Sequence, residues 1–599
     1  MEVSLNRRRI IEKHYPIIQE IEPLSPLSIG NGEFGFSIDV TGLQSFPEAY
    51  EVPLSTQSNW GWHYTGGKNR FNELDIEYQY FSHNNREIPY PFKPGERETA
   101  YHWLRQNPHR LQLGQLGFFF VDDNNQPLDK NSISHIDQVH NLLEGIVYSR
   151  YKIMDTEVVV ETCCDPVSDS IFVRVYSELI QRGNISVVLS FPAPDVTNNA
   201  WSKTVDLNWS NEHRHQTKLI ENKERTACIE RNMDDDSYYV FWSFNDGDIH
   251  QENTHQLILM PNTADYLEFS VTFSKDMEME HYQEHDIQMK SKKYWNDFWQ
   301  NGAFISFEGS KDTRALELER RIILSQYLTA IHSGGSLPPQ ETGYMGNSWF
   351  GKIHLEMHWW HSAHFALWGR EEIVDKSLRW YEKVLTYAEK LATNQGFIGA
   401  RWPKMVGIDG QQSPSPVGPG LIWQQPHPIM LAELIYRANQ NMELLRKYQE
   451  IIFQTADFMV DFVHWEPEEE AYVLGPSMIP AQECHRMEET RNPPFELEYW
   501  KFGLETAITW ARRLGKKPNQ KWLDVASKIK KPDSLDGTYP AHENCYTTFT
   551  EKNHDHPSMV AAYGILPGKL INREVMRKTL KRVKEEWRWE TAWGWDFPM

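Results

Sequence analysis

The feature that most constrains the fold of this sequence is a change in hydrophobic periodicity near residue 276. From about residue 20 up to that point, apolar and polar residues alternate in runs such as GIVYSRYKIMDTEVVVETC and YLEFSVTF, separated by Asn, Asp, Gly and Pro clusters. A period of two indicates strands with one buried face. Because no helical segments separate the runs, they predict an antiparallel β-sandwich over residues 1–275.

After residue 310 the apolar residues recur with a helical period, in segments such as EEIVDKSLRWYEKVLTYAEKLAT and LLRKYQEIIFQTADFMVDFVHW. This pattern predicts an all-α domain over residues 310–599, joined to the first domain by a charged helical linker at 276–309. Long Gly- and Pro-rich loops at 396–425 and 474–494 separate its helices. Loops of this length in a compact domain are more often functional than connective. We expect them to gather at one end of a helical barrel.

The overall charge excludes one class of partner. The 599 residues include 83 acidic and 61 basic ones, for a formal net charge of −22, whereas binding to a nucleic acid backbone needs a clustered positive surface. No run of about eighteen apolar residues occurs, and the first twenty residues lack an apolar signal core. We therefore expect a soluble protein that binds neither nucleic acid nor membrane. Its assembly state stays open, with a homodimer among the alternatives.

The cysteines point to a compartment. The five cysteines form no CxxC pair and show no zinc spacing. This pattern favours a reduced, cytoplasmic location.

A rigid loop in the helical half presents a carboxylate. The segment GPSMIPAQE runs from Gly475 to Glu483 and contains two prolines and a glycine. A general acid works only when it is held within hydrogen-bond reach of the atom that it protonates. The loop is therefore a candidate mount for a catalytic Glu483, although an ordinary connector with a solvated glutamate would have the same composition.

An aromatic segment between residues 349 and 361 alternates polar and aromatic side chains. His354 and His358 stand four residues apart, but the sequence between them is HLEMH and not HExxH, so Leu355 takes the place of a zincin general base. We therefore expect no metal here. If the segment passes from extended to helical near Leu355, it can direct several side chains into one cavity: Trp349, Lys352, His354, Glu356, His358 and Trp359.

Two further loops carry groups that suit a polyol. Arg401 and Trp402 lie in GARWPK, and Trp423 and Gln424 follow in WQQPHP. Together they offer a bidentate donor, a stacking face and an amide, although a packed loop around a buried arginine would look the same.

A third loop places carboxylates beside histidines. Its candidates are Glu543, Asp555 and His556.

These motifs together resemble a known group of enzymes. The loops read IGNGEFGF, GKIHLEMHWW, GARWPK, GPSMIPAQE, NPPFELEYW and HDHPSMVAAYGILPG, and their succession resembles glycoside hydrolases of families 65 and 95. The resemblance spans nearly the whole chain as a series of short motifs. It implies a β-sandwich, a linker helix and an (α/α)6 six-hairpin toroid. It also implies hydrolysis of an α-linked glycoside with inversion, without a cofactor.

The resemblance also implies roles for two carboxylates. In family 95 a Pro-Ser-x-Ser-Pro-Glu-Asn loop carries the general acid, and in family 65 a Gly-Pro-Asp-Glu loop does so, which makes Glu483 the expected acid. Glu356 corresponds to a residue that holds sugar hydroxyls in subsite −1. Family 95 has paired asparagines where this chain has Lys352 and His354, so the resemblance does not extend to fucose.

The general base is not identified by the resemblance. In these families it comes from a segment beyond the last residues of this sequence, and roughly nine helices are predicted after residue 310, fewer than a closed toroid contains. We therefore expect a toroid that is incomplete at its C-terminal end. From the residues alone, Glu543 is the first candidate base, Asp596 the second and Asp555 the third.

Two other functions fit the same motifs. The first is an inverting disaccharide phosphorylase, in which phosphate replaces water and no base is needed, although the acidic loops oppose phosphate binding. The second is a carbohydrate-binding protein that keeps the cleft but has lost turnover. The sequence names neither the sugar nor the linkage.

Overall fold

The computed structural model describes residues 6–196, 207–262, 265–277 and 284–599. The chain divides into two compact units. The sheet unit comprises residues 1–70, 106–352 and 368–370, and the helical unit comprises residues 71–105, 353–367 and 371–599.

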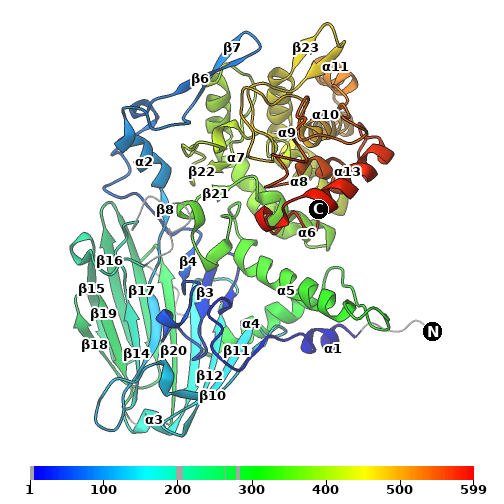
Figure 1. The fold of residues 1–599 in the computed structure, drawn as a ribbon. Coiled ribbons are helices and arrows are strands. Elements are labelled where there is room, and N and C mark those ends of the chain that lie inside the picture. Colours follow the sequence, from blue (N-terminus) through cyan, green and yellow to red (C-terminus); the bar gives the residue numbers. More distant parts are fainter. Residues whose placement is uncertain (1–5, 197–206, 263–264, 278–283) are drawn as a thin grey trace. The chain divides into compact units, whose positions relative to one another are not determined.

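The sheet unit is built from antiparallel sheets (Figure 1). The largest has nine strands, which are, in spatial order, β1 (Ile17–Ile18), β10 (Ile133–Asn141), β11 (Ile146–Ile153), β12 (Thr156–Cys164), β13 (Ser170–Tyr176), β20 (Tyr266–Ser274), β17 (Asp236–Phe244), β16 (Thr226–Met233) and β15 (Gln216–Lys223). A four-stranded sheet has the order β18 (Asp248–Asn253), β19 (Gln256–Met260), β14 (Ile185–Ser190) and β9 (Gln115–Phe120). The smaller sheets are β2 (Leu27–Gly30), β3 (Phe34–Ile38) and β4 (Thr56–Ser58), and the pair β5 (Trp62–His63) and β8 (His109–Arg110).

Side chains of these sheets share one hydrophobic core. In β14 every second residue is buried, namely Ile185, Val187 and Leu189, and these pack with residues of the nine-stranded sheet such as Val160. Alternate burial is the expected result of the period of two, because successive side chains of a strand point to opposite faces. The predicted antiparallel β-domain is confirmed.

The sheet unit also includes helices. They are α1 (Arg7–Glu12), α3 (Glu178–Gln181), α4 (Glu284–Gln300) and α5 (Ala315–Ser333). In α4, Trp299 Nε1 donates to the Leu142 carbonyl at 2.8 Å, and in α5 the Tyr327 hydroxyl lies 2.9 Å from His140 Nε2. The sheet unit therefore extends through α5, past the boundaries expected at 276 and 310. Residues 278–283 of the expected linker lie outside the described residues.

The helical unit includes a β-hairpin that lies far from the helices of the unit in sequence. Its elements are β6 (Gln79–His83), β7 (Arg86–Tyr90), α2 (Glu98–Gln106), β21 (Ile353–His354), α6 (His358–Leu367), α7 (Glu371–Asn394), β22 (Met405–Val406), α8 (His427–Ala438), α9 (Met442–Phe462), β23 (His464–Glu466), β24 (Ala471–Val473), α10 (Pro494–Arg513), α11 (Gln520–Lys528), α12 (Ala561–Gly564) and α13 (Arg573–Glu586). Arg86 in β7 donates both terminal nitrogens to Asp461 in α9, at 2.9 and 2.8 Å. This bidentate pair fixes the hairpin to the helices.

The helices of this unit are amphipathic and pack in sequence. In α7 the buried residues include Val374, Leu378 and Tyr381, which lie on one face at helical spacing. Helix α7 packs against α8, α9 against α10, and α10 against α11. Among the described residues, no helix combines the length and the apolar character that crossing a membrane requires.

The long loops between these helices contact one another. The Ile479 amide donates to the Gly420 carbonyl at 2.8 Å, which joins the α9–α10 loop to the α7–α8 loop. Gln482 Nε2 donates to the His554 carbonyl at 2.8 Å, in the loop that precedes α12. Three loops thus meet around residues 475–483, as the sequence predicted for a loop cluster.

Candidate active site

A lysine joins two carboxylates within this loop cluster. Lys404 Nζ lies 2.6 Å from Glu483 Oε1 and 3.0 Å from Glu356 Oε1. Glu356 follows β21 and Lys404 precedes β22, and the Leu355 amide donates to the Lys404 carbonyl at 2.8 Å. Lys404 and Glu356 are buried, whereas the Glu483 side chain is 27% exposed. One cation therefore serves two anions, and the accessible one is Glu483.

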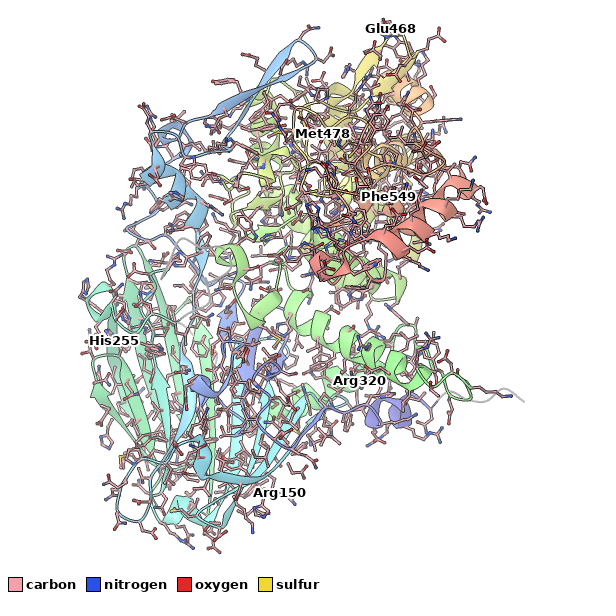
Figure 2. The ribbon with its side chains drawn as sticks, in the orientation of Figure 1. Arg150, His255, Arg320, Glu468, Met478 and Phe549 are labelled. Atoms are coloured by element: carbon pink, nitrogen blue, oxygen red, sulfur yellow. The ribbon has the colours of Figure 1, made fainter. Side chains whose placement is uncertain are left out.

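The backbone of the Glu483 loop is held at several points. Gly475 has φ +78°, and a Cβ there would lie 2.5 Å from the Thr490 carbonyl oxygen, so the turn requires glycine. Met478, labelled in Figure 2, is fully buried. Closer to the carboxylate, the Ala481 amide donates to Glu496 Oε1 at 2.6 Å. These contacts give Glu483 the fixed mount that its predicted role needs.

Glu496 is an uncommon support for a loop. It lies in the first turn of α10 and is fully buried, and burial raises its pKa to about 8. The carboxyl group is therefore largely neutral at neutral pH. It accepts the Ala481 amide without placing a full charge in the core.

Replacing Glu496 with glutamine is expected to stabilise the protein at alkaline pH. A raised pKa in the folded state means that the carboxyl group favours folding below its unfolded pKa near 4.5, and that this contribution is lost as the pH rises through about 8. The loss amounts to roughly 5 kcal/mol at most, at about 1.4 kcal/mol for each pH unit between 4.5 and about 8. Glutamine keeps the acceptor for Ala481 and does not ionise. Urea unfolding of both proteins between pH 5 and 9 measures the difference, and parallel pH profiles would contradict this role of Glu496.

A second polar cluster lies beside Glu483. His556 Nδ1 is 2.9 Å from Asp596 Oδ1, and His556 Nε2 is 3.6 Å from Asp555 Oδ1. Burial alone would lower the pKa of His556, but the hydrogen bond to Asp596 and the charges of Asp555 and Glu483 outweigh it and raise the pKa. Burial raises the pKa of Asp555; the nearby His556 opposes this effect and the negative charge of Glu483 adds to it. These interactions place Asp555 and His556 within electrostatic range of Glu483.

The two aspartates of this cluster have different environments. Asp596 is buried, and its second oxygen accepts the Trp593 amide at 2.7 Å. Both Asp596 oxygens are thus engaged in holding the cluster. The Asp555 side chain is 17% exposed and accepts a longer bond, 3.1 Å, from Trp593 Nε1. Of the two, Asp555 is the carboxylate that a water molecule can reach.

Tryptophans line the same region. The Trp595 ring stacks on His556 with centroids 4.0 Å apart, and on Trp360 with centroids 4.7 Å apart. Trp423 lies 5.9 Å from Trp595. Flat aromatic faces beside carboxylates are typical of sugar sites.

Several predicted substrate-binding side chains are interior residues. Arg401 is fully buried and donates to the Leu421 carbonyl at 2.6 Å. Trp402 Nε1 donates to Thr455, Gln424 Nε2 to the Leu421 carbonyl, and His358 lies 2.8 Å from the Ser377 hydroxyl. These side chains are buried and bonded to protein groups, so they shape the loops. For Arg401 the structure matches the alternative of a packed loop.

Glu543, the first candidate for the base, is also engaged with protein groups. Its Oε2 accepts a hydrogen bond from Asn492 Nδ2, and its Oε1 lies 3.8 Å from Arg491. Its amide donates to the Arg491 carbonyl at 2.8 Å. Glu543 therefore anchors a loop, and its carboxylate is less free to bind a water molecule than that of Asp555.

The remaining predicted residues lie in different units. Trp349 and Lys352 belong to the sheet unit, where Lys352 Nζ donates to the Asn107 carbonyl. His354 lies in the helical unit and is fully buried, whereas Trp359 is half-buried in α6. Sequence reasoning did not single out Lys404, Glu496, Trp360 or Trp595. The only signal for Lys404 was its position at the end of GARWPK.

The chain was compared with known proteins. No protein-family model and no curated protein matches it. Among solved structures it is similar to one named "Putative kojibiose phosphorylase from human microbiome", with a TM-score of 0.63 and 12% identity over 89% of this chain and 72% of the other. It is also similar to a bacterial glucoamylase complexed with acarbose, with a TM-score of 0.52 and 10% identity over 95% and 82% of the two chains. A GH92 α-mannosidase from Bacteroides thetaiotaomicron matches with a TM-score of only 0.33, at 10% identity over 86% and 64% of the two chains.

The first two of these structures show a likeness of fold. The chain shares their combination of an antiparallel β-domain followed by a helical region. The resemblance inferred from short motifs is thereby confirmed at the level of the fold.

Proposed function

We propose that this chain is an inverting α-glycoside hydrolase with an (α/α)6 catalytic domain, in which Glu483 is the general acid and Asp555 the general base. The single observation that carries the proposal is the charge of the loop cluster. Four carboxylates, Glu356, Glu483, Asp555 and Asp596, are joined by contacts or charge interactions to one lysine and one histidine.

This charge favours water over phosphate as the nucleophile. With Lys404 and His556 both positive, the cluster is still negative even when Asp555 is protonated, since three anions then face two cations. A phosphate dianion would be repelled, because phosphate sites need a net positive or amide-rich nest. Water carries no such penalty.

The proposed reaction uses each group once. Glu483 donates a proton to the glycosidic oxygen as the bond from C1 to that oxygen breaks. Asp555 takes a proton from a water molecule whose oxygen attacks C1 from the opposite face. This mechanism needs the two carboxyl groups about 6.5–9.5 Å apart, which leaves room for the water. Glu356 and Lys404 bind hydroxyl groups of the sugar, which rests on the tryptophans.

The ion pair with Lys404 has a consequence for the acid. Before substrate binds, Lys404 touches both Glu483 and Glu356, and the three groups together carry one negative charge. A sugar hydroxyl that displaces the lysine contact frees the Glu483 carboxyl group to face the glycosidic oxygen. A carboxylate pair that shares one cation is thus compatible with a general acid.

The product distinguishes this function from the alternatives. We expect sugar release from α-linked disaccharides in phosphate-free buffer, with the β-anomer appearing first in proton NMR spectra. Formation of a sugar 1-phosphate only when phosphate is added would identify a phosphorylase. An initial α-anomer would contradict inversion. Binding of sugars without any turnover would favour the carbohydrate-binding alternative.

One comparison favours a phosphorylase as the second candidate, because the solved structure with a TM-score of 0.63 carries that name. The identity of 12% makes this a similarity of fold. A cytoplasmic location stays a prediction.

A further inference from the structure

Two histidines and a cysteine converge next to the Glu483 loop. The side-chain nitrogen and sulfur atoms of His485, His542 and Cys545 lie within 4.8 Å of one another, and all three residues are buried. His485 comes two residues after Glu483 in the α9–α10 loop, whereas His542 and Cys545 lie in the loop between α11 and α12. The three residues are not used in the proposed reaction.

The hydrogen bonds of the histidines suit a metal ligand set. His542 Nδ1 lies 3.0 Å from the Glu543 carbonyl, so this nitrogen carries the proton and Nε2 keeps a lone pair. A histidine that binds a metal commonly donates its other N–H to a carbonyl in this way. His485 is only 6% exposed, and its Nε2 is buried without a hydrogen-bond partner in the structure. An unpaired buried nitrogen is costly unless a ligand satisfies it.

We propose that His485, His542 and Cys545 bind a Zn²⁺ ion. Two imidazoles and a thiolate match the borderline-soft character of Zn²⁺, and a water molecule would complete a tetrahedral site. Binding converts the Cys545 thiol to a thiolate, and the proton goes to solvent.

The surrounding charges are mixed. The positive charge of Lys552 acts against a cation near both histidines, but Lys552 Nζ is engaged as the donor of a hydrogen bond to the Cys484 carbonyl at 2.9 Å. The negative charges of Glu489 and Glu543 act on His542 in the opposite direction and favour a cation there.

The ion would tie two loops together. It would join the residues that follow Glu483 to the 542–545 segment, which precedes Asp555 in the same loop. A metal that binds the folded chain stabilises it. In this proposal the ion holds together the two sides of the loop cluster that carry the proposed acid and base.

Cobalt provides a direct test on the full-length protein. After treatment with a chelator, the protein is titrated with Co²⁺ alone. We expect one equivalent to bind, with a thiolate-to-cobalt absorption band in the near ultraviolet that Zn²⁺ abolishes. Cys545→Ser should remove this band and weaken Co²⁺ binding at least tenfold. His485→Ala should also weaken binding at least tenfold. None of these readouts depends on turnover, so the test can fail or succeed independently of the proposed hydrolase activity.

Two matched cysteine variants serve as controls. Cys484→Ser changes the thiol next to His485, and Cys228→Ser changes a buried thiol in the sheet unit. Both should bind Co²⁺ as the parent does, and circular dichroism checks their folding. If Cys545→Ser is unfolded, His542→Gln replaces it. Absence of the thiolate band in the parent, an unchanged band in Cys545→Ser, or its loss in Cys484→Ser would overturn the proposed site.

Discussion

Replacing Glu483 with glutamine is expected to lower kcat by about 10² to 10⁴, the usual contribution of a positioned general acid. Glutamine keeps the size of the side chain but has no proton to donate. Its amide can still lie beside Lys404, and the loop stays anchored through Ala481 and Glu496. The loss should therefore appear in kcat with little change in stability.

The leaving group sharpens this test. The leaving group of a 4-nitrophenyl glycoside departs as the stable 4-nitrophenolate anion. It needs less protonation than the sugar hydroxyl that leaves from a disaccharide. The Glu483→Gln variant should thus lose much more activity on a disaccharide than on the nitrophenyl substrate. Glu488→Gln, an exposed glutamate of the same loop, is the matched control. Equal losses on both substrates, or no loss at all, would remove Glu483 from the role of acid.

Replacing Asp555 with asparagine is expected to lower kcat by at least about 10², because no group then accepts the proton of the attacking water. The competing assignment is Glu543. Glu543→Gln should have a much smaller effect, since that side chain contacts Asn492 and Arg491. A large loss in Glu543→Gln together with normal activity in Asp555→Asn would restore Glu543 as the base.

The pH profile gives an independent measure of Asp555. The base must be ionised, so activity falls as the pH drops through its pKa. Because burial and Glu483 raise this pKa, the acidic limb of kcat/KM is expected above pH ~4, the ordinary value for aspartate. The positive charge of His556 opposes this rise, so His556→Asn should move the limb to higher pH. A shift to lower pH would contradict the proposed contact.

Much of the fold followed from hydrophobic periodicity. Alternation predicted the sheets because a half-buried strand requires it, and helical spacing predicted segments such as α7 and α9. The boundaries between the sheet unit and the helical unit did not follow from periodicity. Helices α4 and α5 have helical patterns, but Trp299 and Tyr327 bury against the sheet unit, and periodicity does not reveal which neighbour covers an apolar face.

The site was predictable only in part. The Pro- and Gly-rich loop marked Glu483 because rigidity leaves a local signal, whereas Arg401 and Trp402 carry the chemistry of a sugar site and are buried in the protein. A guanidinium that can bind a polyol binds backbone carbonyls equally well. Lys404 and Asp555 depend on contacts between distant loops. No spacing along the chain encodes these contacts.

The cluster of Trp360, Trp423 and Trp595 has a consequence for how the site is assembled. Its members come from α6, from the loop before α8 and from the last turn of the described chain. Contacts between residues so far apart in sequence form late, because the loops that they close carry a large entropic cost. During synthesis the Glu483 loop emerges well before Asp596, the partner of His556. The helices can therefore fold while the site is still incomplete.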